Sequence, residues 1–144
     1  MHRVFGVKQD AAYYDRAGAY LIPIREHRVG IVQTPKGYFF LGGGLEGDEG
    51  DLACIQRECL EEAGYQPRVG EKLCTAETYT THPRVGYFHP IQTYYLGELG
   101  EKVAEPVEKD HRFLWVDADW LRGKLFADMQ NWALEQALLA LAHA

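Results

Sequence analysis

The sequence predicts a single α/β domain in which strands are layered against helices. Apolar or aromatic runs of about one strand's length alternate with segments of helical periodicity, and this mixture is typical of layered α/β domains. A chain of 144 residues has the size of one domain. It contains no internal repeat, low-complexity tract or long linker. We therefore expect residues 1–144 to fold as one domain.

The first half of the chain is predicted to form a hairpin, a short strand and a helix. The apolar runs Tyr20–Ile24 and Val29–Gln33 are separated by a charged turn, which favours a hairpin. A second turn leads to the short strand Tyr38–Leu41, which runs into consecutive glycines. The helix is expected over Asp51–Ala63, with Gly64 as its C-terminal stop.

One side of the Asp51–Ala63 helix is expected to pack on the core. Apolar residues recur along it at helical spacing and form this stripe: Leu52, Ile55, Cys59 and Ala63. The glutamates of the helix are then expected on another face.

The second half is predicted to add three strands, a short helical turn and a C-terminal helix. Tyr, Thr and Leu mark two strands around a loop, and a strongly helical segment ends the chain. In order, the elements are strand Lys72–Thr81, loop His82–His89, strand Pro90–Gly97, strand Arg112–Val116, turn Asp117–Leu121 and helix Ala127–Ala142.

Composition narrows the class of partner. The net charge of −6 argues against a broad basic surface for large nucleic acids or anionic membranes. The three cysteines are odd in number and form no CxxC pair, which favours a reduced protein without structural disulfides. The N-terminus has no signal-peptide apolar region, and no apolar run approaches a membrane span. These features predict a cytoplasmic protein.

Three glutamates of the predicted helix are the most informative feature of the chain. Glu58, Glu61 and Glu62 stand at i, i+3 and i+4, where helical neighbours lie about 5–6 Å apart. Like charges at this spacing repel by a few tenths of a kcal/mol per pair, so the helix gains nothing locally. Hard divalent cations prefer oxygen ligands, and such an ion would convert the repulsion into coordination. The spacing therefore predicts a Mg²⁺ or Mn²⁺ site.

The glutamates belong to a longer pattern. Five residues separate Gly43 from Glu49, and seven separate Glu49 from Arg57-Glu58; the pattern ends with Cys59, Leu60, Glu61, Glu62, Ala63, Gly64 and Tyr65. This stretch resembles the signature of the Nudix hydrolases, G-x5-E-x7-R-E-U-x-E-E-x-G-U, in which U is a bulky apolar residue. Every fixed Gly, Glu and Arg is present, and Cys59 stands where an aliphatic residue is usual. The resemblance implies an α/β/α sandwich with a mixed β-sheet and a Nudix box at 43–65.

The resemblance also implies roles for individual residues. Glu58, Glu61 and Glu62 are the main metal ligands, and either Glu58 or Glu61 is the general base. Glu49 and Arg57 form an ion pair that fixes the loop on the helix and so serves catalysis. Two further ligands are the Gly42 carbonyl and a glutamate ahead of Trp115, for which Glu108 is favoured over Glu105.

Phosphate contacts are expected from the glycines and from one loop. Gly43 and Gly44 allow close approach of the backbone, whose N–H groups can face a phosphate. Arg84 is a candidate phosphate ligand in the loop between the strands. The nearby His82 and His89 lack the further ligands that a zinc site requires, which favours a surface or hydrogen-bonded role.

The resulting functional hypothesis is a metal-dependent hydrolase that cleaves a phosphoanhydride bond in a nucleoside diphosphate linked to another moiety. A nucleoside triphosphate, as in MutT-type proteins, is the first choice of substrate. ADP-ribose and dinucleoside polyphosphates come next. The resemblance implies a Pro about 15 residues past the box for the first and a Tyr about 16–18 residues past it for the second. Neither marker is met, since the residues there are Thr80, Thr81, His82 and Pro83. The alternative from another class is a non-catalytic module that senses nucleotides. The oligomeric state is left open, with a homodimer as one option.

Overall fold

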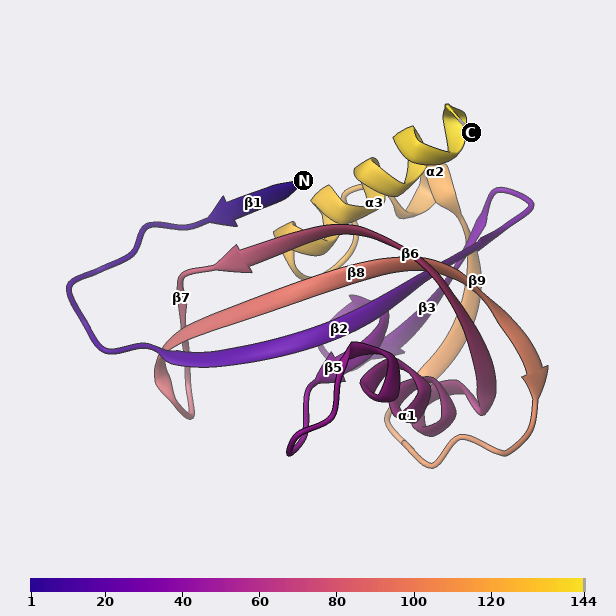
Figure 1. Cartoon of the computed structure of the whole chain (residues 1–144), viewed down its shortest axis with the longest axis horizontal. Helices are drawn as coiled ribbons and strands as arrows, with labels where there is room; N and C mark the ends of the chain where they lie inside the picture. Colours follow the sequence, from indigo (N-terminus) through magenta and orange to yellow (C-terminus); the bar gives the residue numbers. More distant parts are fainter. Residues whose placement is uncertain (144) are drawn as a thin grey trace.

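The strands form two sheets, one mixed and one antiparallel, which are joined by a hairpin of two strands. The computed structural model describes residues 1–143 (Figure 1). Its strands are β1 (His2–Phe5), β2 (Tyr14–Arg25), β3 (Arg28–Thr34), β4 (Gly37–Phe39), β5 (Leu41–Gly44), β6 (Tyr65–Thr78), β7 (Thr80–His82), β8 (Gly86–Lys102) and β9 (Arg112–Asp117). Its helices are α1 (Asp51–Ala63), α2 (Ala118–Leu121) and α3 (Asp128–Ala142).

The larger sheet is mixed. It runs in the order β1-β6-β8-β2, with β5 added to β2 and β7 to β8. The pairs β1–β6 and β2–β8 are parallel, whereas β6–β8, β2–β5 and β7–β8 are antiparallel. The smaller sheet holds β4, β3 and β9. Within residues 1–143, it connects to β2 through the pairs Ile24–Val29 and Arg25–Arg28. The predicted hairpin, formed by β2 and β3, therefore connects the two sheets.

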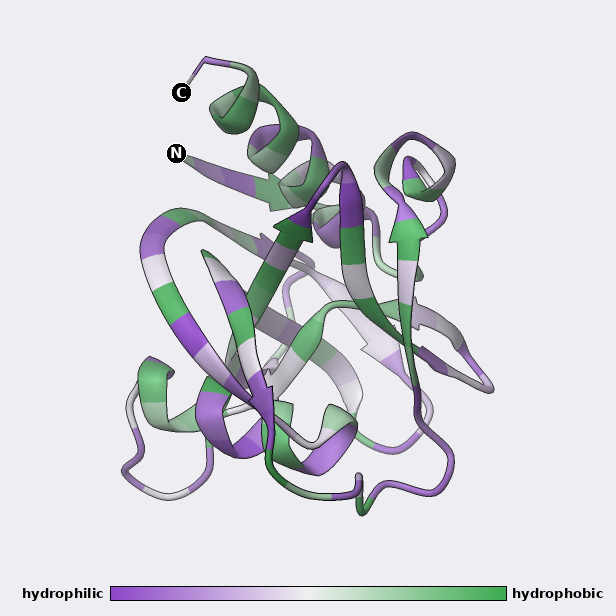
Figure 2. Ribbon diagram, turned by 90° about the vertical axis from the view of Figure 1, so that its right-hand side faces the viewer, coloured by the Kyte–Doolittle hydropathy of each residue, from purple (hydrophilic) through white to green (hydrophobic). Residues whose placement is uncertain are grey.

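Helices α1 and α3 cover opposite faces of the larger sheet (Figure 1). Successive residues of β2 show this, because Leu21 packs in the cluster that contains α1 residues and Ile22 in the cluster that contains α3 residues. This alternation is the period-2 geometry of a strand buried on both faces. Hydrophobic and hydrophilic residues accordingly alternate along strands and around helices (Figure 2). The predicted sandwich with a mixed sheet is confirmed.

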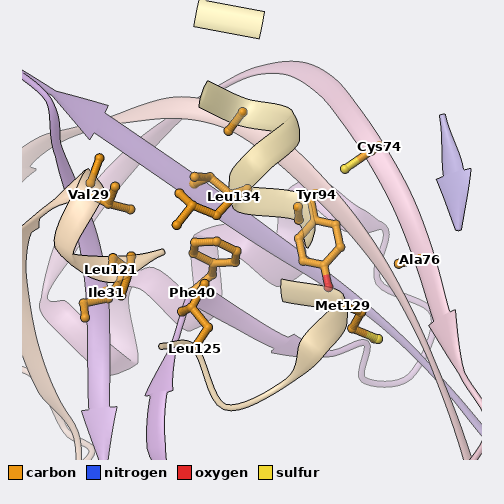
Figure 3. Close-up of a cluster of buried hydrophobic side chains, with 14 residues drawn as sticks. Val29, Ile31, Phe40, Cys74, Ala76, Tyr94, Leu121, Leu125, Met129 and Leu134 are labelled. Atoms are coloured by element: carbon orange, nitrogen blue, oxygen red, sulfur yellow. The ribbon is translucent and has the colours of Figure 1, made fainter. Parts of the chain in front are cut away.

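The core on the α3 side is the larger of the two. Phe40 and Tyr94 are fully buried there, and their rings meet edge to face with centroids 6.1 Å apart. Leu134 and Met129 of α3 close this core from above the sheet (Figure 3). The C-terminal helix therefore belongs to the same hydrophobic unit as the sheet.

Helix α1 begins and ends at the predicted residues, but its buried stripe differs from the prediction. Leu52 is 55% exposed, and Cys54 is buried in its place. The reason is the contact with β5, where the Cys54 thiol donates to the Gly43 carbonyl at 3.3 Å. Glu62 also turns inward and is only 6% exposed, so the glutamates do not all lie on a solvated face. The expected stop is confirmed, because Gly64 has φ of +75° and its N–H caps Cys59 and Leu60.

The strands are longer than the sequence pattern indicated. Strand β6 extends from Tyr65 and β8 to Lys102, and much of the expected loop His82–His89 lies in strands, leaving a short turn between β7 and β8. The sequence pattern did not indicate the full length of β6 and β8, because register shifts along their ladder break the apolar–polar alternation that identifies a strand. Strand β1 has no apolar run of its own and forms by pairing with β6.

Two expectations about composition can be compared with the fold. The three cysteines are free thiols and all are buried. Across residues 1–143, no helix has the length and apolar content that crossing a membrane would require.

Candidate metal and phosphate site

The glycines of β5 bring the backbone against the glutamates of α1. The N–H of Gly42 donates to Glu62 Oε1 at 3.0 Å, a buried hydrogen bond between strand and helix. A Cβ added at Gly43 would clash with the Glu58 carboxylate, and one added at Gly42 would clash with the backbone of β2. The absence of side chains at Gly42 and Gly43 is therefore what lets two carboxylates reach this strand.

Replacing Gly43 by Ala should displace the Glu58 carboxylate and lower kcat by about tenfold or more, since a misplaced catalytic group can cost 10²-fold. The effect on stability should be small, because the atoms in the way are the end of the flexible Glu58 side chain. Gly50→Ala is the matched control, because a Cβ there meets no atom within 4 Å. Steady-state kinetics and thermal unfolding of the two variants check the prediction; equal kcat values would contradict it.

Arg57 connects the loop, the helix and the carboxylates. Its guanidinium donates to both oxygens of Glu49, at 2.6 and 3.2 Å, and to Glu58 Oε1 at 2.5 Å. A further bond at 3.2 Å reaches the carbonyl of Gly44. The hydrogen bonds from Arg57 lower the pKa of Glu49 to about 2, so that carboxyl stays ionised. The structure thus contains the Glu49–Arg57 ion pair that the sequence predicted, at the junction of loop and helix.

The pKa values of the helix carboxyls Glu58 and Glu62 are shifted in the opposite direction, upward. Burial raises the pKa of Glu58 to about 7, an effect that Arg57 opposes and Glu61 adds to. Burial also raises the pKa of Glu62 well above its ordinary value, and Glu58 adds to that rise. Burying carboxylates beside one another disfavours their charged forms unless a cation offsets them. One guanidinium is shared among them, which leaves room for a further positive charge.

These shifts predict how stability depends on pH in the absence of divalent metal. A carboxyl whose pKa is raised on folding binds more protons in the folded state, so its contribution is full below about pH 4.5 and is lost as pH rises through the folded pKa. Glu58 and Glu62 should therefore make the free energy of unfolding fall as pH rises from about 5 to 8. Glu49 acts oppositely but only below its ordinary pKa of 4.5. Denaturant titrations in EDTA at pH 5 and 8 check the direction, and Glu58→Gln should weaken the dependence; stability that rose over this range would contradict it.

A loop places Glu108 beside the C-terminal end of α1. The carbonyl of Glu61 accepts hydrogen bonds from the N–H groups of Val107 and Glu108, at 3.0 and 3.3 Å. The Gly64 carbonyl anchors the start of the same loop by accepting from Val103 and Ala104. The pKa of Glu62 is raised chiefly by burial and by Glu58, and the negative charge of Glu108 adds to that rise. The exposed Glu105 instead lies near Lys102.

His111 is a member of this cluster that the sequence reasoning missed. Its Nε2 lies 3.8 Å from Glu62 Oε2, and its Nδ1 lies 3.9 Å from Glu108 Oε2. Nδ1 is buried and has no hydrogen-bond partner among residues 1–143. Its position three residues after Glu108 was the available signal, but only the docking of the loop on α1 brings the ring to Glu62.

Arg84 does not join the carboxylates. It lies in the turn between β7 and β8 (Figure 1). Gly86, the first residue of β8, precedes Gln92 by six residues, which is roughly 20 Å along a strand, and Gln92 is level with Gly18 and hence with Gly44. The structure therefore unites the glycines and glutamates of the motif and leaves Arg84 at the far end of the sheet.

The two histidines near Arg84 form no metal pair with each other. His89 is buried, and its ring nitrogens lie 2.8 Å from an Asp15 oxygen and 2.9 Å from a Glu77 oxygen. His82 packs its ring on Phe88. The hydrogen-bonded role that the sequence favoured is what His89 has.

A second group of potential ligands lies far from the motif. His27, Asp117 and Asp119 have ligand atoms within 4.8 Å of one another, and all three are exposed. His27 pairs with Asp119 at 3.1 Å, and Asp117 caps α2 by accepting from the Trp120 N–H. Because these side chains are exposed and already have partners within the protein, they are explained as ordinary surface residues.

The comparisons with known proteins agree with this geometry. The sequence model of the NUDIX domain matches residues 12–136, which is most of the chain. The chain therefore belongs to the Nudix family, and its class of activity is that of the Nudix pyrophosphohydrolases, which act on nucleoside diphosphates linked to another moiety and use divalent metal ions.

Solved structures of similar shape carry related names. A NUDIX hydrolase from Nitrosomonas europaea superposes with a TM-score of 0.74 at 16% identity and covers 88% of this chain and 90% of its own. A MutT NUDIX hydrolase from Burkholderia pseudomallei gives 0.71 at 22% identity, covering 85% and 98%. The E. coli ORF135 protein gives 0.65 at 20% identity, covering 91% and 94%. No curated protein matches the sequence significantly.

Proposed function

We propose that this protein hydrolyses a phosphoanhydride bond of a nucleoside triphosphate, with Mg²⁺ or Mn²⁺ held chiefly by Glu58, Glu61 and Glu62. The observation that carries the proposal is the convergence of two of these carboxylates on the glycines of β5, where the buried Glu62 accepts from the Gly42 N–H and Glu58 lies against Gly43. The name of the Burkholderia pseudomallei structure, a MutT hydrolase, favours the triphosphate among the substrates of the family.

The residues fit a divalent cation. Glu62 is nearly buried and its pKa is raised, as expected of a carboxylate whose counter-charge is a bound ion. The donors on offer are oxygens, which Mg²⁺ and Mn²⁺ prefer. The Gly42 carbonyl and Glu108 complete the proposed ligand set. When bound, the ion would neutralise phosphate charge and lower the pKa of the attacking water.

The chain's own groups have separate tasks in this proposal. Either Glu58 or Glu61 takes the proton of the attacking water. Arg57 and Glu49 hold the glycine loop on α1 and set the direction of Glu58. Gly43 and Gly44 of β5 are proposed to let the phosphates approach the backbone closely, and Arg84 would be reached only by a substrate that extends along the sheet.

The test is product analysis over a substrate panel. Nucleoside triphosphates, 8-oxo-dGTP, ADP-ribose and diadenosine polyphosphates are incubated with Mg²⁺ or Mn²⁺, and phosphate, pyrophosphate and nucleotide products are measured. Metal-dependent release from triphosphates supports the proposal. Turnover confined to ADP-ribose or dinucleoside polyphosphates would replace the triphosphate as the proposed substrate, and nucleotide binding without turnover would favour the nucleotide-sensing module.

A cytoplasmic location is proposed with the enzyme, in keeping with its free thiols.

Mg²⁺ should stabilise the folded protein, because a ligand that binds only the folded state raises its stability by RT ln(1 + [L]/Kd). At a hundredfold excess over Kd this is about 2.7 kcal/mol. For a chain of this size the Tm should rise by roughly 5–10 °C. Differential scanning calorimetry with and without Mg²⁺ measures it, with Ca²⁺ and Na⁺ as comparisons. Glu62→Gln should reduce the rise; a Tm unaffected by Mg²⁺ and Mn²⁺ would remove the metal site from the proposal.

A further inference from the structure

A free guanidinium lies against the glycine strand β5, on the face of the sheet opposite to the one that Glu58 contacts. The side chain of Arg16 lies directly against Gly44, in the space that a Cβ there would need. Among residues 1–143 it forms no ion pair and no hydrogen bond. Arg57, by contrast, is fully engaged with carboxylates and a carbonyl. Arg16 is therefore an exposed cation beside the glycines with its donors unused, which is the state expected of a phosphate ligand.

An exposed aromatic surface continues from Arg16 along the same face of the sheet. Tyr14 is two residues before Arg16 on β2, so both side chains point to one face. Tyr14 is directly opposite Phe88 on β8, and their rings are stacked with centroids 6.1 Å apart and an interplanar angle of 19°. Tyr14 is 53% exposed. The pair has nearly parallel rings, of which Tyr14 is exposed and Phe88 is half-buried.

This surface lies on the α3 side of the sheet but beyond the helix. Ile22 and Tyr20 of β2 pack in the α3-side cluster, and Tyr14 and Arg16 share their face by alternation. The start of β2 extends past the N-terminal end of α3, which leaves the face uncovered there (Figure 1). Tyr20 and Gly42 connect this surface to the carboxylates, since Tyr20 lies directly against Gly42, whose N–H donates to Glu62 Oε1 at 3.0 Å.

We propose that Tyr14 and Phe88 form a stacking subsite for the nucleobase of the substrate, with Arg16 binding the phosphate between that base and the glutamate site. The inference rests on the proposed function, because it takes the phosphate chain to lie at Glu58, Glu61 and Glu62. Two residues along a strand span about 6.6 Å, which is comparable with the distance from the phosphate to the base of a nucleotide. An anionic group with a planar ring at that distance complements a guanidinium followed by stacked aromatics.

The experiment measures equilibrium binding as well as turnover, so that it does not depend on catalysis. Isothermal titration calorimetry in Mg²⁺ uses two probes: a nucleoside triphosphate analogue with methylene bridges in place of the anhydride oxygens, and inorganic triphosphate. The variants are Tyr14→Leu, Phe88→Leu and Arg16→Gln. Tyr87→Leu is the matched control, since Tyr87 is also an exposed aromatic but contacts Tyr13 on the other face.

We expect Tyr14→Leu and Phe88→Leu each to weaken binding of the nucleotide analogue by about tenfold, as loss of one base–aromatic stack does. They should leave inorganic triphosphate unaffected and raise KM for the triphosphate with little change in kcat. Arg16→Gln should weaken both probes, and Tyr87→Leu neither. Thermal unfolding shows whether each variant is folded.

The outcomes separate this inference from the proposed function. Wild-type affinity and KM in the folded Tyr14 and Phe88 variants, with turnover intact, would overturn the subsite and leave the hydrolase. Nucleotide binding that needs Tyr14 and Phe88, in a protein without turnover, would keep the subsite and overturn the hydrolase. Binding of neither probe by the wild type would overturn both.

Discussion

Replacing Glu61 by Gln should lower kcat by 10²–10⁴-fold and leave the fold intact. That range is the usual contribution of a general base, and loss of a metal ligand acts in the same direction. Glu61 gives the cleanest separation of activity from stability. Its side chain is 34% exposed, and its one ion pair with Arg57 is long, at 3.4 Å. Steady-state kinetics with Mg²⁺ and a Tm measured in EDTA check both parts.

Glu62→Gln should lower activity in the same way but move the stability of the metal-free protein upward. The buried carboxylate is costly to ionise, as its raised pKa shows, whereas a neutral amide still accepts the Gly42 N–H. The Tm in EDTA at pH 8 should therefore rise as kcat falls.

The exposed Glu105 supplies the control for both variants, because it is 87% exposed and lies in the loop that carries Glu108. Glu105→Gln should retain wild-type kcat and Tm, whereas Glu108→Gln should lower turnover. A Glu61→Gln or Glu62→Gln enzyme with the wild-type rate would show that the metal site lies elsewhere.

Replacing Arg57 by Ala is expected to have the second-largest effect, on both activity and stability. The change removes two bonds to Glu49, the bond to Glu58 and the bond to the Gly44 carbonyl. Hydrogen bonds to charged groups contribute about 1.5–3 kcal/mol each when buried. Arg57 is 22% exposed, so solvent screens part of this and we expect a total loss of about 2–3 kcal/mol. The Tm should fall by roughly 5–10 °C.

The kinetic consequence should be a fall in kcat of about 10²-fold, because Glu58 loses the group that orients it and the loop is released from α1. Arg57→Lys tests whether charge or geometry matters. A lysine keeps the charge but cannot bond both oxygens of Glu49 and Glu58 at once. It should therefore recover little activity. The exposed Arg68, on β6, provides the control substitution Arg68→Ala; a similar loss there, or full activity of Arg57→Lys, would contradict the positioning role.

The sequence was sufficient to predict the glutamate-bearing helix and its metal-binding motif, because both depend on the spacing of nearby residues. Helix α1 follows from residues three and four apart, and Gly64 stops it by adopting a left-handed conformation. The Glu49–Arg57 pair was likewise predictable, since the signature joins a loop to the helix that follows it directly. The mixed sheet between two helices followed from the family resemblance and from the order of the elements.

Other features were decided only by packing between distant segments. Strand β1 and the long β6–β8 ladder form through pairing partners and contain bulges, which hide them from periodicity. Glu62 is buried because Gly42, twenty residues earlier, offers it an N–H, a contact that no local rule contains. His111 reaches Glu62 only because its loop docks on the end of α1.

Spacing within one helix therefore determined which chemistry this chain carries. The surfaces around that chemistry belong to the tertiary structure. Tyr14 is distant in sequence from Phe88, and Arg16 is distant from the glycine strand. The parallel pairing of β2 with β8 and the antiparallel pairing of β2 with β5 bring each to its neighbour. Sheet register relates residues by hydrogen bonds between strands, and a linear sequence does not specify that register.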